Sequence, residues 1–197
     1  WGTAANWNTT LGGGGSVRTT PNAGDILIFD GSNIGTGGSG AVTVNTLVTE
    51  TVAQLKFINN ANVTMGHSST RTITIGGSTG DDYVIEAGSS VTHGYTSNVS
   101  AITLILSTGT KASVAGTLTL QLGSHKITPA NEAECISFEG TSIFNHNVSS
   151  GAAFGNATAV STNNNVIFKN GSTFNFGGGS NPFVSSAPAS VTQFQSG

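Results

Sequence analysis

The sequence predicts an all-β fold, namely a right-handed parallel β-helix (β-solenoid) of about six rungs with an N-terminal cap. Three observations support this prediction. Apolar residues alternate with Thr or Gln over short stretches, as in Leu118–Leu120–Leu122, and a period of two is typical of strands. The chain has 28 glycines, and its Gly-Ser, Asn-Gly and Asp-Gly pairs favour turns. Short segments also repeat at a spacing close to one solenoid turn.

The repeat consists of a small residue with an apolar residue on either side. Its members align on Ala61, Gly88, Gly109, Gly140, Gly171 and Gly197, and from Gly88 on these are 21, 31, 31 and 26 residues apart. Three positions earlier stand Ile58, Ile85, Leu106, Phe168 and Phe194, and three positions later stand Val91, Ile143 and Phe174. We therefore expect equivalent apolar residues to stack rung upon rung, because a single rung cannot bury its own apolar face.

In chain order, residues 1–24 are expected to form an N-terminal cap or loop of one solenoid segment that spans residues 1–197. The indoles of Trp1 and Trp7 would close the end of the solenoid, since an open sheet edge invites association. The apolar run at 26–29 predicts a strand that starts after Asp25 and ends in a turn at Asp30 and Gly31. A carboxylate pair for catalysis is not expected there, because five residues of extended strand hold the two aspartates about 16 Å apart.

Later strands are expected around residues 42–44, 73–75 and 118–122 and on either side of each small residue of the repeat. No stretch has helical spacing of its apolar residues over 11 positions, and residues 129–136 could form only one or two helical turns. In the Gly140 unit the apolar residue, Phe138, precedes the glycine by two positions, which predicts a shortened turn or a bulge.

The unit at residues 166–174 gives the most specific structural predictions. Phe168 and Phe174 should point inward on either side of Gly171, and Phe194 should pack against Phe168 from the next rung. Lys169 should point outward because successive side chains alternate along a strand. Gly171 should adopt a positive φ in the Asn-Gly turn.

The composition excludes several classes of protein. Only 8% of residues are charged and the net charge is −3, with no basic cluster, so nucleic-acid binding is not expected. The longest apolar runs are too short to span a membrane. The single cysteine, Cys135, excludes an internal disulfide framework and is expected to be a buried apolar residue.

The segments WGTAANWN at 1–8, PNAGDILIFDGS at 21–32, AQLKFINNANVT at 53–64 and NPFVSSAPASVTQFQSG at 181–197 carry a family resemblance. Together with FKNGSTF at 168–174, they resemble the repetitive β-helix regions of large bacterial surface proteins. Many such proteins leave the cell by type IX secretion, and some resemble autotransporter passengers. The resemblance implies that the chain is a fragment of a longer repetitive protein, located outside the cell or on its surface.

Three functions are compatible with these patterns. The first is a non-enzymatic structural or adhesive segment of a surface protein or filament, whose partners are neighbouring repeats of the same polypeptide or other copies in an assembly. The second is a glycan-binding module in which Trp1, Trp7, Tyr83 or Tyr95 stack on sugars. The third is a β-helix polysaccharide lyase or hydrolase, which the scattered positions of the six Lys and Arg residues disfavour. We expect no enzymatic activity, no catalytic residues and no insertion into a membrane.

Other polar residues give weaker signals. Asp81, Asp82 and Glu86 are the densest acidic group and could bind Ca²⁺ weakly, although they are also compatible with a solvated turn; no other cofactor is expected. The four histidines, His67, His93, His125 and His146, lack metal-binding spacing and are expected in exposed turns. Two separated Thr-x-Thr pairs, at 72–74 and 117–119, do not predict a flat array of hydroxyl groups.

Overall fold

The computed structural model describes residues 1, 7–8, 15–18, 21–35, 38–77, 79–94, 100–148, 152–154, 164–179, 183 and 192–196. Within these residues the chain forms 17 strands and no α-helix. The strands build three sheets in which every neighbouring pair is parallel. The predicted β-solenoid is therefore confirmed, with about five turns where about six rungs were expected. Its right-handed sense remains a prediction.

The turns of the solenoid contribute strands to the sheets in a fixed order, and the first four turns contribute one strand to each of the three sheets. The seven-stranded sheet contains β1 (Ile26–Asp30), β4 (Gln54–Ile58), β7 (Tyr83–Ile85), β10 (Ala112–Val114), β13 (Ile136–Phe138), β15 (Val166–Phe168) and β17 (Thr192–Phe194). The six-stranded sheet contains β2 (Ala41–Val44), β5 (Asn62–Met65), β8 (Ser90–His93), β11 (Thr117–Gln121), β14 (Ile143–Asn147) and β16 (Thr173–Gly178). The four-stranded sheet contains β3 (Glu50–Val52), β6 (Arg71–Ile75), β9 (Ile102–Leu106) and β12 (Lys126–Thr128).

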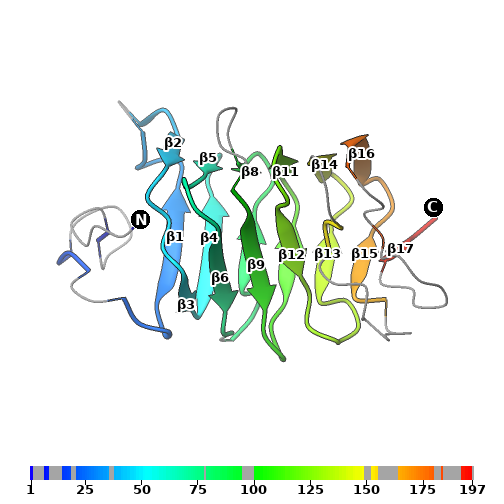
Figure 1. Ribbon diagram of the computed structural model, residues 1–197, viewed down its shortest axis with the longest axis horizontal. Coiled ribbons are helices and arrows are strands. Elements are labelled where there is room, and N and C mark those ends of the chain that lie inside the picture. Colours follow the sequence, from blue (N-terminus) through cyan, green and yellow to red (C-terminus); the bar gives the residue numbers. More distant parts are fainter. Residues whose placement is uncertain are drawn as a thin grey trace.

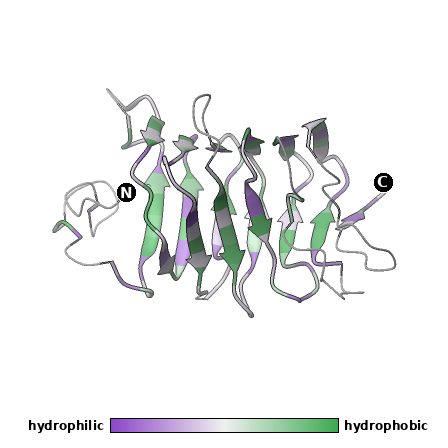
Figure 2. Ribbon diagram, viewed as in Figure 1, coloured by the Kyte–Doolittle hydropathy of each residue, from purple (hydrophilic) through white to green (hydrophobic). Residues whose placement is uncertain are grey.

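The strands follow one another along the long axis of the molecule, and the two termini lie at opposite ends (Figure 1). Hydrophobic residues gather on the strands, whereas many of the connecting segments are hydrophilic (Figure 2). This distribution follows from the fold, because inward strand residues of all three sheets share a single interior. The structure is thus a stack of rungs around one apolar core.

The register of the seven-stranded sheet defines a column, by which we mean the residues at equivalent positions of successive rungs. Its inward members are Phe29, Phe57, Ile85, Val114, Phe138, Phe168 and Phe194. Where two aromatic residues are adjacent in the column their rings stack, with centroids 5.1 Å apart for Phe29 and Phe57 and 4.3 Å apart for Phe138 and Phe168. The predicted stacking of Phe168 on Phe194 is confirmed, with centroids 4.8 Å apart.

The register also corrects three members of the predicted repeat. Phe57, not Ile58, is the inward residue that pairs with Ile85. Leu106 belongs to β9 in the four-stranded sheet, so Gly109 lies at a different corner of the solenoid from Gly88 and Gly171. The residue that occupies the Phe168 column in that turn is Val114. The error arose because more than one corner of each turn uses a glycine, so glycine alone does not identify the corner.

The Gly140 unit is not shortened. Six positions separate the paired residues Phe138 and Phe144, as they separate Phe168 and Phe174 in the next rung. Only the glycine is displaced by one position, and the expected bulge is absent from this turn. As a result Phe144, which pairs with Phe174 in the six-stranded sheet, is the buried residue at this position. Ile143, which was expected to point inward, is 38% exposed.

The rings of Trp1 and Trp7 cover the end of the solenoid at the first rung. Their centroids lie 6.2 and 5.2 Å from that of Phe29, the first member of the aromatic column. Trp1 is buried, and the Trp7 Nε1–H donates a hydrogen bond to the Trp1 carbonyl at 2.9 Å. Arg18 links the N-terminal segment to the solenoid through ion pairs with Asp25 and Glu50, at 2.6 and 3.2 Å. Most other residues of the expected cap at 1–24 lie outside the described residues.

Replacing Phe168 by Ala is expected to lower the free energy of unfolding by about 3–5 kcal/mol, because a ring that is 1% exposed leaves a cavity between two stacked neighbours. Lys169→Ala is the matched control. The lysine side chain is 39% exposed and makes one surface ion pair, with Glu139, so its loss should cost under about 1 kcal/mol. Urea melts of the two variants provide the measurement, and equal losses would contradict the observed register.

Gly171→Ala is expected to destabilise the chain more than Gly109→Ala. Both glycines have positive φ, +88° and +84°, so Ala is strained by about 1–2 kcal/mol at either site. A Cβ at Gly171 would also lie 2.5 Å from the Gly140 carbonyl oxygen of the adjacent rung, whereas one at Gly109 meets nothing within 4 Å. Thermal melts should separate the two variants. Identical melting temperatures would argue against this close approach of the rungs.

Candidate functional site

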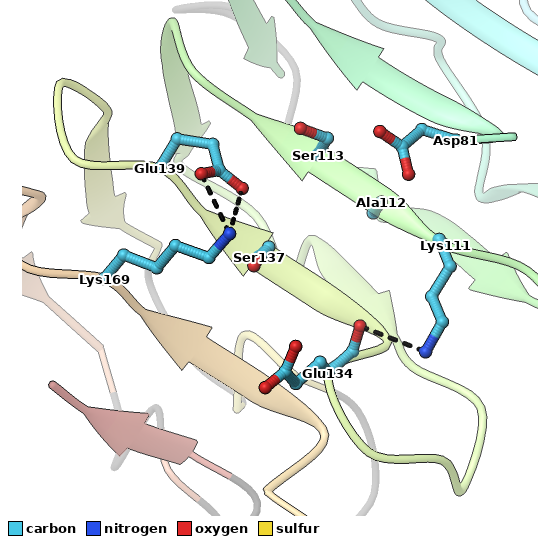
Figure 3. Close-up of a pocket in the computed structure, with 8 residues that line it drawn as sticks. All are labelled: Asp81, Lys111, Ala112, Ser113, Glu134, Ser137, Glu139 and Lys169. Atoms are coloured by element: carbon cyan, nitrogen blue, oxygen red, sulfur yellow. Dashed lines mark hydrogen bonds and ion pairs between the residues drawn. The ribbon is translucent and has the colours of Figure 1, made fainter.

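Charged side chains gather at one shallow depression on the outer face of the seven-stranded sheet. It has a volume of about 240 Å³ and lies across β10 and β13. Its lining consists of Asp81, Lys111, Ala112, Ser113, Glu134, Ser137, Glu139 and Lys169 (Figure 3). Strand alternation places the hydroxyl groups of Ser113 and Ser137 on this outer face, because Ala112, Val114, Ile136 and Phe138 point inward.

The two lysines of the depression already have partners within the protein. Lys169 Nζ donates to both carboxylate oxygens of Glu139, at 2.9 and 3.0 Å. Lys111 Nζ donates to the backbone carbonyl of Ala133 at 2.7 Å. It also donates to that of Glu134 at 3.3 Å (Figure 3). The depression therefore combines three carboxylates with two lysines, of which Lys169 forms an ion pair with Glu139. Its hydroxyl groups and carboxylates are suited to hydrogen bonds with a polar ligand.

The fold brings together residues that are far apart in the sequence. Glu139 directly follows Phe138, and Lys169 directly follows Phe168, so the two charged residues are neighbours on adjacent rungs. In sequence the segments ISF and VIF are followed by residues of opposite charge, but this signal identifies the pair only once the register is known. The interpretation that the basic residues are widely spread is thus wrong for Lys111 and Lys169.

The acidic residues considered for Ca²⁺ do not converge. Asp82 is fully buried, and its carboxylate accepts hydrogen bonds from Gln54 Nε2 at 3.2 Å and from the Lys111 backbone N–H at 3.1 Å. Asp81 precedes β7, whereas Glu86 follows it and accepts a hydrogen bond from the Asn59 backbone N–H. No group of three or more His, Cys, Asp or Glu side chains within the described ranges could hold a metal ion.

The aromatic residues considered for sugar stacking are mostly turned inward. Tyr83 is fully buried and packs against Phe57, and burial raises the pKa of its hydroxyl group. The Trp1 ring is buried and Trp7 is half-buried at the end of the solenoid. Tyr95 lies outside the described residues. Tyr83 and Trp1 therefore present no open ring face to a sugar.

Asp25 and Asp30 have structural partners of their own. Asp25 forms the ion pair with Arg18, and Asp30 accepts hydrogen bonds from the side chains of Ser32, Asn33 and Asn59 at 2.6, 2.7 and 2.9 Å. The hydrogen bonds from Ser32 and Asn59 hold the pKa of the Asp30 carboxyl at about 2. The expected turn after β1 is thus confirmed, and Asp30 stabilises it.

Three of the four histidines are buried, which corrects their expected place in exposed turns. His93 and His146 point inward from β8 and β14, in the same column as Met65 and Leu120. Among the described residues, the ring nitrogens of His93 have no hydrogen-bond partner. His125 is buried before β12, where its Nδ1 accepts a hydrogen bond from the Ile102 N–H at 3.0 Å. The sequence did not reveal these positions, because histidine is a polar residue that is usually exposed. Only the fold shows that these three side chains are buried.

Burial keeps these histidines neutral. It lowers the pKa of His93 to about 3, with a smaller contribution from His125, whose ring centroid lies 6.5 Å away. Burial likewise lowers the pKa of His125 to about 4 and shifts that of His146 in the same direction. All three rings are therefore uncharged at neutral pH and occupy space within the core.

The outer face of the six-stranded sheet has a different character from the depression. None of its six strands contains Asp, Glu, Lys or Arg. One outward column consists of Thr43, Thr64, Thr92, Thr119, Asn145 and Asn175. Thr119 of the Thr-x-Thr pair at 117–119 belongs to this column, whereas Thr117 pairs with Ser90 and Ile143. Hydrogen bonds link the later members of the column, Asn145 to Thr119 at 3.0 Å and Asn175 to Asn145 at 2.9 Å.

A scan against models of protein families finds no match for this chain, and searches of curated proteins and of solved structures find none either. The resemblance to bacterial surface β-helix proteins therefore stays a prediction. In the part of the chain that the structure describes, no helix is long and apolar enough to cross a membrane.

Lowering the pH from 7.5 to 5.0 is expected to destabilise the fold through His93 and His125. Their pKa values in the folded chain are about 3 and 4, below the ordinary 6.5, so the unfolded chain binds more protons below pH 6.5. Above pH 6.5 the two histidines do not reduce the free energy of unfolding. As the pH falls towards their pKa values in the folded chain, each lowers it by up to about 1.4 kcal/mol per pH unit. Urea unfolding across this range measures the loss.

His93→Leu provides the control for this prediction, because Leu120 already occupies the next position of the same column. The variant should take up about one proton fewer on unfolding, so its free energy of unfolding should depend less steeply on pH. Asp30 does not interfere, since its carboxyl titrates below pH 3.8 in both states. An unchanged slope in His93→Leu would contradict the neutral, buried state of this ring.

Proposed function

We propose that this chain is a non-enzymatic structural and adhesive segment of an extracellular bacterial surface protein or filament. The observation that carries the proposal is the unbroken parallel register of the seven-stranded sheet, from β1 to β17. In such a stack each rung adds about 4.8 Å of length without new chemistry. The role of the segment is then to provide a stiff spacer that holds other parts of a surface protein away from the cell.

The outer surface supports a role in adhesion. The column of Thr and Asn residues on the six-stranded sheet offers hydroxyl and amide groups at the regular spacing of the strands, and no charge interrupts it. Neutral hydrogen-bonding groups in a regular row favour contact with other neutral polar surfaces, because no charged group must be desolvated. Neighbouring repeats and other copies of the protein are the partners that this face is proposed to meet.

A second candidate function is glycan binding at the depression on the seven-stranded sheet. Ser113, Ser137 and Asp81 surround it with hydroxyl and carboxylate oxygens, which suit the hydroxyl groups of a sugar. The same observation bears on the lyase or hydrolase alternative, since carboxylates and lysines lie side by side there. We rank catalysis below binding because Glu139 and Lys169 are occupied by each other and the depression is shallow.

The functions are separated by incubating the purified chain with neutral and acidic polysaccharides, with and without Ca²⁺, and measuring both product formation and retention. A structural segment gives no product in any mixture. Retention that is lost in a Ser113→Ala and Ser137→Ala double variant, but kept in a Thr64→Ala and Thr92→Ala control, would favour the glycan-binding module. Turnover that disappears in Asp81→Asn or Glu139→Gln would overturn the non-enzymatic assignment.

A further inference from the structure

The two ends of the solenoid differ in how their last aromatic rings are covered. At the first rung, Phe29 is 6% exposed because Trp1 and Trp7 pack on it. At the other end, Phe194 of β17 is 54% exposed, although it belongs to the same column. Phe176 of β16, the last strand of the six-stranded sheet, is 53% exposed. Two aromatic rings are therefore about half exposed at the C-terminal end, where Phe183 also contacts Phe194 with ring centroids 5.6 Å apart.

The open rings stand at positions that are buried wherever another rung follows. Phe138 and Phe168 precede Phe194 in its column and are 0% and 1% exposed. His146, which precedes Phe176, is 0% exposed and stacks on it with centroids 5.4 Å apart. Among the described strands, β17 pairs only with β15, and β16 only with β14, so these two strands end their sheets.

The backbone at this end already follows the path that leads into a further rung. In earlier rungs the residue after the inward column residue donates its N–H to the carbonyl of that column in the rung before. Examples are Glu139 to Val114 at 2.8 Å and Lys169 to Phe138 at 2.9 Å, and Gln195 does the same to Phe168 at 2.9 Å. In sequence, Gln195, Ser196 and Gly197 also stand where Lys169, Asn170 and Gly171 stand one rung earlier.

We propose that the end face formed by β16 and β17 is a docking surface for one further parallel rung that continues this polypeptide after residue 197. Such a rung would pair with the outer edges of β16 and β17. It would also lay an apolar side chain on each of Phe176 and Phe194. The contact continues the rung-to-rung interface that the rest of the solenoid repeats. This inference rests on the proposed structural role and specifies the surface through which the segment is extended.

The inference is tested by appending a second copy of residues 172–197 directly after Gly197, which keeps six positions between Phe194 and the copied Phe174. The matched control carries the same extension with the copied Phe176 and Phe194 changed to Asp. Hydrogen exchange of the peptide that covers residues 192–196 is measured in the original chain, the extension and the control. We expect exchange to slow at least about tenfold in the extension alone, because opening of β17 then requires the loss of a second interface.

Equal exchange in all three proteins would overturn the proposal. So would concentration-dependent dimerisation of the original chain in sedimentation experiments if Phe194→Glu abolishes it, because the surface would then belong to a second copy. Neither outcome affects the polysaccharide assays, so failure of this inference is distinct from failure of the proposed function.

Discussion

The stacking of inward side chains between parallel rungs is the interaction on which the rest of this structure depends. A parallel sheet fixes the distance between neighbouring strands, so each inward residue must fill the space between the residues above and below it. The column through Phe57, Ile85, Val114 and Phe138 shows that the type of apolar residue can vary while its position cannot. The register therefore determines which positions of the sequence must be inward and apolar, but not which apolar residue each of them carries.

The same constraint explains the corners. Adjacent rungs approach so closely at a turn that a Cβ on Gly171 would meet backbone of the rung beside it. Gly88, at the equivalent corner, also has positive φ, and Asn60 takes that conformation in a third rung with φ of 59°. Asparagine tolerates the left-handed region better than other residues with a side chain, which is why it can replace glycine at this corner.

These facts determine how much could be predicted from the sequence. Alternation and turn residues were sufficient for the all-β solenoid and for the positive φ of Gly171, because these features are local. The stacking of Phe194 on Phe168 was placed correctly because both residues stand three positions before a glycine of the repeat. The corner of Gly109 and the inward place of His93 could not be found in this way. Both depend on which residues some 30 positions apart become neighbours, and the length of the intervening turns varies from rung to rung. For the same reason the pairing of Glu139 with Lys169 was visible only once the register was known.

The outward columns are free of the packing constraint, and this separates the fold from its surface chemistry. A substitution at an outward position does not alter the packing of the inward column. The outer faces of the two sheets can therefore carry different kinds of residue. The seven-stranded sheet carries the charged depression at Lys111 and Glu139, whereas the six-stranded sheet carries neutral Thr and Asn residues. Length is equally independent, because adding a rung repeats an existing interface. A protein of this kind can therefore change its reach and its contacts without redesigning its core, which is the property that a structural and adhesive surface segment requires.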